Sequence, residues 1–312
     1  MMDAEERELF TKGIHRATAS FSGTDLDAAL DELGWQDALA VDAATTVATV
    51  FECQGAAATT SSALGIVMAS ALGVGLEGST GVVLPARGQV APPGMPNGVV
   101  QGIGLATLAS ESRSLVATAD GAHIVDTAAL DLRPVGGMDP RLGLVVVSGT
   151  AEPIETLVID ADWPEAVAAG QRALAHELVG VSRTMLGLAR DHAVDRVQFD
   201  RPIAGFQAVR HRLADSLVAI EAADAAACAA GHDGSPLTAA LAKAIAGRSA
   251  RTVARHAQQV LAGIGFTTEH PLHLYVRRAL VLDVLLGDTR SLTASLGRQL
   301  LADRRLPSLL PL

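Results

Sequence analysis

The sequence predicts a mainly helical protein with an N-terminal helical domain, a small central β domain and a C-terminal bundle of the four-helix type. Three observations support this. Hydrophobic residues make up 49% of the 312 residues but aromatic residues only 3%, so the core is built from Ala, Leu and Val, of which Ala and Leu favour helices. Long stretches repeat apolar residues at helical spacing. Between them lies one stretch rich in Gly and Pro with short apolar runs.

We assign residues 1–78 to the N-terminal helical domain, where apolar residues recur in steps of three or four. At its end, Gly73–Gly78 fits the G-x-G-x-x-G pattern of dinucleotide sites. That pattern requires a preceding strand, a following helix and an acid about 20 residues later. Here the preceding stretch is helical, the following one is rich in Pro, and Gly98 stands where the acid belongs. We therefore interpret the motif as a turn between domains.

Residues 79–161 form the predicted β domain. The dipeptide Asp120-Gly121 separates two apolar-rich runs, which indicates a hairpin with a tight turn there. The runs at residues 144–147 and 157–159 read as two further strands.

The predicted bundle spans residues 162–305, with a tail at 306–312. Asp162 is expected to cap the first helix with Glu165 as its reciprocal partner, Pro164 being tolerated in the first turn, and the helix runs to about Asp195. The second helix repeats apolar residues in steps of three or four, which predicts one continuous buried stripe. The stripe consists of Phe206, Val209, Leu213, Leu217, Ile220, Ala223 and Ala227.

Three more helices complete this predicted bundle. Ser235-Pro236 begins the third, which stops near Gly263. A shorter one follows His270-Pro271 and ends at Gly287, a residue suited to ending a helix, and Asp288 then caps the last.

Charge and composition exclude several functions. A net charge of −10 argues against nucleic acid, because phosphate binding requires a basic surface. The longest apolar stretch, 63–76, is too short to span a bilayer, and the acidic N-terminus does not resemble an export signal. With Cys53 and Cys228 as the only cysteines, neither a disulfide framework nor a thiolate metal site is expected. These features predict a cytoplasmic protein with no nucleic-acid or membrane partner.

The pair His270 and His273 next to Glu269 could suggest a metal site, but too few ligands lie nearby and Pro271 disturbs the helical register. Packing and capping at a helix start is the preferred interpretation, and we predict no metal.

The segment 195–209, between the two longest helices, concentrates two Arg, two Gln and two Phe at one end of the bundle. A planar guanidinium beside aromatic and amide groups suits a pyrophosphate next to a flat ring system. The same residues also suit an ordinary helix corner with Phe206 in the core, and the residues alone leave both interpretations open.

Two stretches carry a resemblance to a known family. RVQFDRPIAGFQAVRHRLAD (196–215) and QQVLAGIGFTTEHPLHLYVRRA (258–279) resemble two segments of the acyl-CoA dehydrogenase family, in that family's order. The resemblance covers residues 162–305 well. It implies a helical domain, a β domain and a bundle that forms the dimer interface, with FAD lying between subunits and electron-transfer flavoprotein as the acceptor.

The resemblance also implies cofactor-binding residues. Arg196 would meet the pyrophosphate of FAD, and Phe199 would pack near the cofactor with Gln198 beside it. Gln207 and Gln259 would supply hydrogen bonds. Three positions depart from the family pattern, because Asp200 and Ala262 each replace a Gly and Leu261 replaces a common His. The backbone at Gly263 would approach the cofactor closely.

Family members remove the α-proton of an acyl-CoA with a carboxylate in one of two places. The corresponding residues here are Leu286 and Gly170, neither of which can accept a proton. The position after Gly170, often Arg in relatives, is Gln171. Residues 79–130 also lack the T-E-P-x-x-G-S-D loop and the W-I-T-N-like strand that clasp the flavin ring in relatives.

We therefore favour a non-catalytic subunit that completes the FAD site of a longer homologous partner. That partner would bind most of the acyl-CoA, in lipid or sterol-side-chain β-oxidation. A second hypothesis is a self-sufficient homo-oligomer that uses Asp288 or Glu177 as an unusual base. A third is a structural interaction protein without a cofactor.

Overall fold

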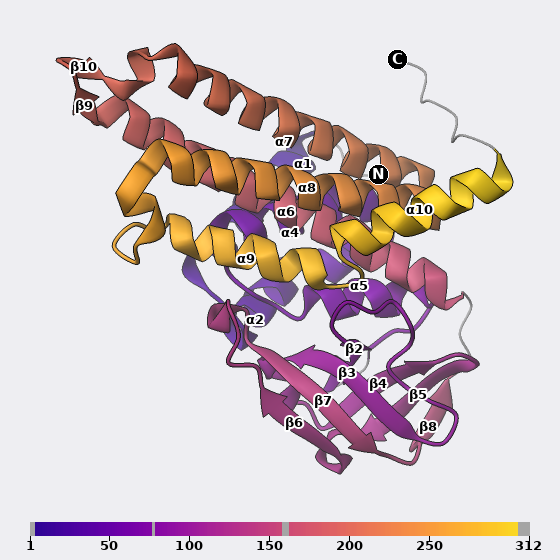
Figure 1. Ribbon diagram of the computed structural model, residues 1–312. Coiled ribbons are helices and arrows are strands. Elements are labelled where there is room, and N and C mark those ends of the chain that lie inside the picture. Colours follow the sequence, from indigo (N-terminus) through magenta and orange to yellow (C-terminus); the bar gives the residue numbers. More distant parts are fainter. Residues whose placement is uncertain (1–3, 77–78, 158–161, 305–312) are drawn as a thin grey trace.

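The computed structural model describes residues 4–76, 79–157 and 162–304. Figure 1 shows a β domain below, a bundle of long helices above, and a group of N-terminal helices packed against the bundle. The predicted tail at 306–312, Gly78 of the glycine motif and most of the predicted strand at 157–159 lie outside the described residues. The mainly helical fold with a small β region is confirmed.

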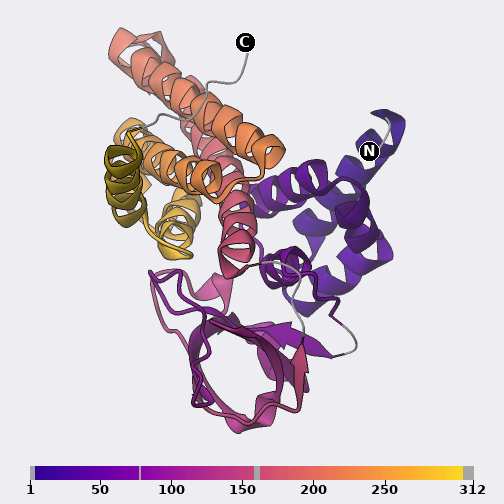
Figure 2. The same cartoon turned by 90° about the vertical axis from the view of Figure 1, so that its right-hand side faces the viewer.

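Five helices form the N-terminal group, and α6 (Trp163–Asp195) separates them from the rest of the bundle (Figure 2). The long α6 packs against α4 on one side and against α7 and α8 on the other. The five helices are α1 (Ala4–Ser20), α2 (Thr24–Glu32), α3 (Trp35–Val41), α4 (Ala43–Ala57) and α5 (Ala63–Ala71).

The helices α4 and α6 cross with their backbones in contact. A β-carbon on Gly55 would overlap the carbonyl oxygen of Glu177, and one on Gly180 would overlap that of Glu52. Only glycine allows two helices to approach this closely. The crossing brings side chains of α4 and α6 into direct contact.

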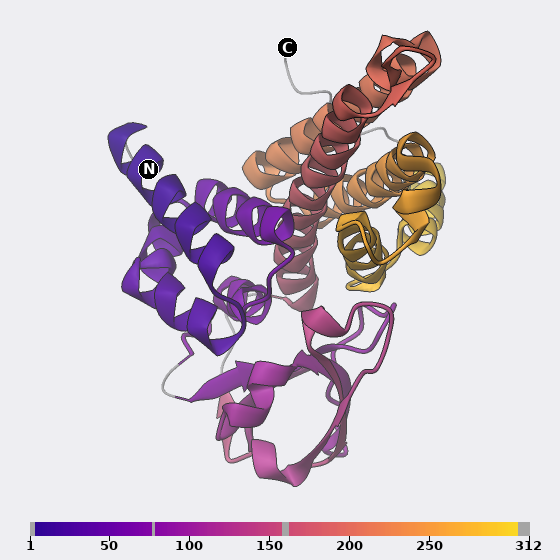
Figure 3. The same ribbon diagram turned by 90° about the vertical axis from the view of Figure 1, so that its left-hand side faces the viewer.

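The β strands form two four-stranded sheets, ordered β1-β4-β5-β8 and β2-β3-β7-β6. Seen end-on in Figures 2 and 3, they curve into a ring. A separate apolar cluster that includes Val83, Val116 and Val147 fills the space between the sheets. The strands are β1 (Thr80–Val82), β2 (Leu84–Pro85), β3 (Val99–Leu105), β4 (Arg113–Thr118), β5 (Gly121–Asp126), β6 (Leu130–Pro134), β7 (Leu144–Thr150) and β8 (Glu155–Leu157).

The bundle contains α6 together with α7 (Gln207–Asp233), α8 (Pro236–Leu261), α9 (Leu272–Val284) and α10 (Thr289–Asp303). A two-residue hairpin, β9 (Val197–Gln198) and β10 (Arg201–Pro202), connects α6 to α7 at the far tip. A short 3-10 helix, η5 (Ala262–Phe266), follows α8.

Most predicted helix starts are confirmed, but one cap is wrong. The side chains of Ser235 and Asp288 cap α8 and α10, accepting hydrogen bonds from the backbone N–H groups of Thr238 and of Ser291 respectively. Asp162 precedes α6 as predicted but forms no side-chain cap bond; its carbonyl oxygen accepts from Glu165 N instead. Pro164 has no backbone N–H group. The first turn of α6 therefore has one fewer unpaired N–H group for a side-chain cap to satisfy.

Two boundaries differ from the prediction. The hairpin of β4 and β5 is confirmed, but Thr118 pairs with Gly121, so the turn residues are Ala119 and Asp120. Helix α9 ends at Val284, and Gly287, with φ 92°, lies in the turn beyond it rather than at the helix end.

The predicted buried stripe of α7 is correct only in part. Ile220, Ala223 and Ala227 are fully buried, whereas Leu217 is 51% exposed and its neighbour Val218 is 69% exposed. This part of α7 therefore presents apolar side chains to solvent. Apolar residues that recur at helical spacing are expected to be buried instead.

Candidate functional site

The hairpin at the bundle tip holds four of the six predicted site residues. Arg196 directly follows α6, Gln198 and Phe199 lie on the hairpin, and Gln207 begins α7. All four side chains are exposed. Phe199 is 86% exposed, and a large aromatic ring left in solvent is expected where another molecule covers it.

The turn of this hairpin explains the family's preference for Gly. Phe199 and Asp200 have φ values of 53° and 62°, in the left-handed region. Glycine adopts this region without strain, whereas most other residues do not. Asp tolerates it better than most non-glycine residues, so the replacement of Gly by Asp200 keeps the turn.

The second segment reaches the same end of the bundle. Gln259 and Gly263 lie at the end of α8 and in η5, and both are exposed. The rings of His192, in the last turn of α6, and His270, just after η5, meet edge to face with centroids 6.5 Å apart. The backbone of Gly263 has open space around it, since a β-carbon there would contact nothing within 4 Å.

Ala262 marks a departure with a structural consequence. Its φ of 53° and ψ of −133° lie in a region that is open to glycine and strained for alanine. The backbone at this position therefore favours the Gly of the family pattern, and Ala262 adopts the same conformation under strain.

Two further side chains at the tip were not identified from the sequence. The Arg201 guanidinium lies 4.2 Å from the centroid of the Phe206 ring, and Phe199 meets the same ring edge to face. Phe266 is 72% exposed. Arg201 and Phe266 both lie inside the two motifs, so their closeness in sequence to the predicted residues was the available signal.

This group of side chains fits the nucleotide half of a flavin cofactor. Among the described residues, the Arg196 side chain forms no hydrogen bond or ion pair, which leaves its five N–H donors free for phosphate oxygens. Phe199 and Phe266 supply aromatic faces, and the open backbone at Gly263 allows close approach.

The two expected base positions lie against each other. A β-carbon on Gly170 of α6 would overlap Cδ1 of Leu286 and lie 3.0 Å from Sδ of Met68. Leu286 is 3% exposed. Gln171 donates a hydrogen bond of 2.9 Å from Nε2 to the Leu286 carbonyl oxygen, which holds the turn in place. Apolar side chains therefore fill the position where a carboxylate would act.

The turn of Leu286 is held from a second side as well. Lys243 of α8 is fully buried, and its Nζ donates to the carbonyl oxygens of Asp283 at 3.0 Å and Gly287 at 3.3 Å. Burial lowers the pKa of Lys243 to about 8. The ammonium group thus fixes the end of α9 and the turn that follows it.

The two acids considered as unusual bases both have structural contacts. Asp288 accepts hydrogen bonds from Arg290 N, Ser291 N and Ser291 Oγ at the start of α10, and these bonds lower its pKa. Glu177 is 2% exposed and lies 3.4 Å from Nη1 of the buried Arg278. Burial raises the pKa of Glu177 to about 7, against the opposing effect of Arg278.

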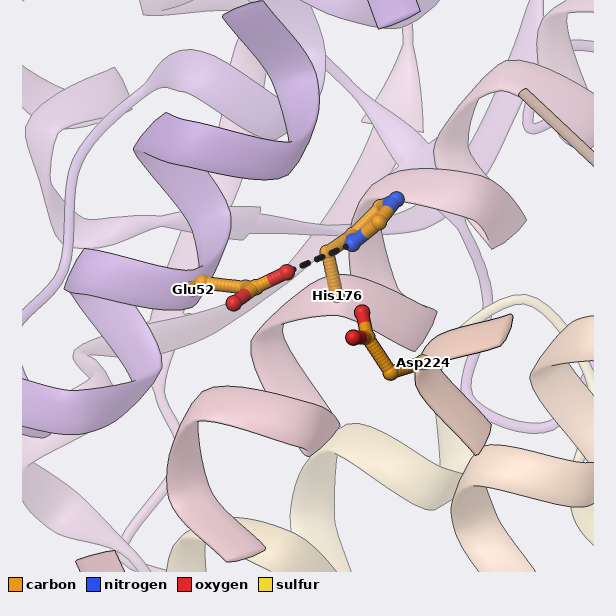
Figure 4. Close-up of side chains that lie close together, drawn as sticks. All are labelled: Glu52, His176 and Asp224. Atoms are coloured by element: carbon orange, nitrogen blue, oxygen red, sulfur yellow. Dashed lines mark hydrogen bonds and ion pairs between the residues drawn. The ribbon is translucent and has the colours of Figure 1, made fainter. Parts of the chain in front are cut away.

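A third group of polar side chains joins α4, α6 and α7 (Figure 4). Ligand atoms of Glu52, His176 and Asp224 all lie within 4.8 Å of one another, an arrangement that could hold a cation. The Arg183 guanidinium contacts Glu52 Oε2 and donates to Asp224 Oδ2 at 2.8 Å, so it already supplies a positive charge between the two carboxylates. We interpret the cluster as an ion-pair network centred on Arg183.

The histidine pair near the tip has the structural role preferred from sequence. His270 Nδ1 accepts a hydrogen bond of 3.2 Å from Leu272 N at the start of α9. His273 Nδ1 lies 2.8 Å from the His270 carbonyl oxygen. These are contacts of packing and capping at the start of α9.

Residues 166–301 match the acyl-CoA dehydrogenase C-terminal domain. The chain is 36% identical over 165 residues to acyl-CoA dehydrogenase IpdE2 of Mycobacterium tuberculosis, which covers 53% of this chain and 50% of the relative. It is 41% identical over 165 residues to acyl-CoA dehydrogenase FadE34 of the same organism, which covers 50% of this chain and 23% of the relative. The matched region thus spans half or less of these relatives.

Two solved structures are similar over nearly the whole chain. The steroid acyl-CoA dehydrogenase Tcur3481-Tcur3483 gives a TM-score of 0.75 at 23% identity and covers 96% of both chains. The ChsE4-ChsE5 complex of Mycobacterium tuberculosis also gives 0.75, at 19% identity, covering 98% of this chain and 99% of that chain.

The helical layer, the small β domain and the bundle with its tip motifs define the acyl-CoA dehydrogenase fold. Residues 166–301 match the C-terminal domain of this family, and over the whole chain the similarity is one of fold. Within the described ranges, no helix is both long and apolar enough to cross a membrane.

Proposed function

We propose that this chain is the non-catalytic subunit of a heteromeric, FAD-dependent acyl-CoA dehydrogenase. One observation carries the proposal, namely the contact between Gly170 and Leu286. Both positions at which relatives place a proton-accepting carboxylate are occupied by residues without one, and Met68 closes the remaining space. This packing supports the proposal, because it leaves no room for a carboxylate at either of these two positions.

The residues of the bundle tip support a role in cofactor binding. Arg196 would bind the pyrophosphate of FAD, and Gln198, Gln207 and Gln259 would donate hydrogen bonds to the nucleotide. Phe199 would pack against it. When bound, FAD would supply the hydride acceptor for desaturation of an acyl-CoA.

A longer homologous subunit would supply what this chain lacks. Its β domain would clasp the flavin ring, its carboxylate would remove the α-proton, and it would bind most of the acyl-CoA. The similarity to the ChsE4-ChsE5 complex and to the Tcur3481-Tcur3483 steroid enzyme supports a heteromer for lipid or sterol-side-chain β-oxidation. The exposed apolar residues Leu217 and Val218 of α7 are consistent with a subunit interface.

Co-expression with a longer homologue that retains the carboxylate tests the proposal. The expected product is a stable complex with the visible absorbance of flavin, and Arg196→Gln should lower its flavin content. A colourless complex, or a chain that binds no such homologue, would contradict the proposal.

The self-sufficient homo-oligomer makes a different prediction. The chain alone would have to bind FAD and bleach it on addition of an acyl-CoA, and Asp288→Asn would abolish bleaching. The three hydrogen bonds that Asp288 accepts at the start of α10 oppose this role, because they lower its pKa and occupy its lone pairs.

A further inference from the structure

A cavity of about 160 Å³ lies between the N-terminal helices and the bundle, apart from the tip and from the base positions. This volume corresponds to roughly five water molecules, and hence to a small organic molecule. Its walls come from α3, α4, α5, α6 and α7. The lining is mainly aliphatic and includes Leu39, Val47, Val67, Ala71 and Ala169.

Two basic side chains of α6, Arg172 and His176, line this mainly aliphatic cavity together with Ser70 of α5. Arg172 donates from Nη1 to the Gly234 carbonyl oxygen at 3.0 Å. Among the described residues it forms no ion pair, although the carboxylates of Glu165 and Asp233 lie near enough to act on its charge. Burial lowers its pKa. The remaining N–H donors of a half-buried guanidinium are therefore available to an anion.

His176 is 3% exposed and is oriented by a carboxylate. Its Nδ1 lies 3.1 Å from Glu52 Oε1, and because a carboxylate accepts hydrogen bonds, Nδ1 carries the proton. Figure 4 shows the second ring nitrogen on the side of the ring away from Glu52. Among the described residues this Nε2 atom forms no hydrogen bond.

We propose that this cavity binds a small carboxylate with a short aliphatic tail. The carboxylate would accept hydrogen bonds from Arg172 and, when the imidazole is protonated, from His176. The aliphatic tail would lie against the leucine, valine and alanine side chains of α3, α4 and α5. The charged head matches the basic side chains of the lining, and the apolar tail matches its aliphatic side chains. An inorganic anion would contact only the basic side chains.

The cavity is separate from the region that carries the proposed function. Helix α5 separates them, since Met68 packs against Gly170 whereas Val67, Ser70 and Ala71 line the cavity. A ligand there would not contact the tip residues or the turn of Leu286. The site can therefore be tested without reference to flavin or to acyl-CoA turnover.

Calorimetric titration of the purified chain with butyrate tests this proposal. We expect one site per chain with a dissociation constant of about 1 mM or tighter. Arg172→Gln should weaken binding by at least about tenfold, the effect of losing a charged hydrogen bond. Ala71→Leu, which fills the cavity without removing any polar group, should abolish binding. Arg190→Gln, an exposed position on α6 that pairs with Asp191, is the matched control and should leave binding unchanged.

Two other probes identify the ligand class. Butan-1-ol has the tail without the charge and inorganic phosphate has charge without the tail, so both should bind at least about tenfold more weakly than butyrate. Phosphate binding as tight as butyrate, or no saturation by butyrate below about 50 mM, would overturn the proposal. Butyrate binding that survives both Arg172→Gln and Ala71→Leu, with the variants folded by circular dichroism, would also overturn it.

Discussion

Gly170 of α6 and Leu286 of the turn after α9 pack against each other so closely that a β-carbon on Gly170 would overlap Cδ1 of Leu286. The two residues are far apart in the sequence, and each stands where a relative could place its base. Because the two residues are in contact, the same packing leaves no room for a carboxylate at either of the two base positions.

A first prediction concerns this contact. Gly170→Ala should destabilise the fold by about 1–3 kcal/mol, because Leu286 and Met68 must move to accommodate the methyl group. Urea denaturation measures the change. Gly187→Ala on the same helix has open space around it and should instead stabilise by about 0.5–1 kcal/mol, since alanine favours the helix over glycine. Equal effects at the two glycines would refute the close packing.

A second prediction concerns the backbone of η5. Ala262→Gly should stabilise the protein by about 1 kcal/mol, because glycine adopts the observed φ of 53° and ψ of −133° without strain. Ala240→Gly, in the first part of α8, should have the opposite sign and cost about 1 kcal/mol of helix stability. Thermal unfolding of the two variants measures the sign of the stability change for each of them. Destabilisation by Ala262→Gly would show that the alanine is not strained.

A third prediction concerns pH. Burial raises the pKa of Glu177 from an ordinary value of 4.5 to about 7. The folded state therefore binds this proton more tightly than the unfolded chain. The stabilisation that the protonated Glu177 adds to the free energy of unfolding is fully present below about pH 4.5 and is lost as pH rises toward 7. The loss in the free energy of unfolding is on the order of 3 kcal/mol.

Glu177→Gln removes this titration and should flatten the fall in unfolding free energy between pH 5 and 7, as measured by urea denaturation at each pH. Glu165→Gln, an exposed position in the first turn of α6, should leave the slope of the wild type unchanged. A slope that persists in Glu177→Gln would assign the titration to another group.

A fourth prediction concerns the tip. In the complex with a longer homologue, Arg196→Gln should weaken FAD binding about ten- to a hundredfold, because a guanidinium–phosphate contact is a charge-assisted hydrogen bond. Flavin release on dilution, followed by fluorescence, measures it. Arg190→Gln, one turn and a half away on α6, serves as the control. Unchanged flavin affinity in Arg196→Gln would favour a structural protein without a cofactor role.

Much of the fold could be predicted from local patterns. Helix starts at Ser235 and Asp288 follow from capping residues that act within one turn, and the hairpin near Asp120 follows from its turn residues. The exposed Leu217 could not be predicted, because a helical stripe indicates an apolar face without saying whether the same chain covers it.

The candidate site was predictable only where it is local. Arg196 and Phe199 lie in one short motif, but the contact between Gly170 and Leu286 depends on how α6 packs against the end of α9. The same is true of Glu52 and His176, which meet because Gly55 and Gly180 let α4 and α6 approach each other. No periodicity within either segment carries that information.

The central claim is that this chain contributes to a flavin site without performing proton abstraction. Anaerobic titration with an acyl-CoA, followed by the visible absorbance of flavin, tests it on the isolated chain and on its complex with a longer homologue. The account predicts a colourless isolated chain and a yellow complex that bleaches only when the homologue retains its carboxylate. An isolated chain that binds FAD stoichiometrically and bleaches on addition of acyl-CoA would contradict it.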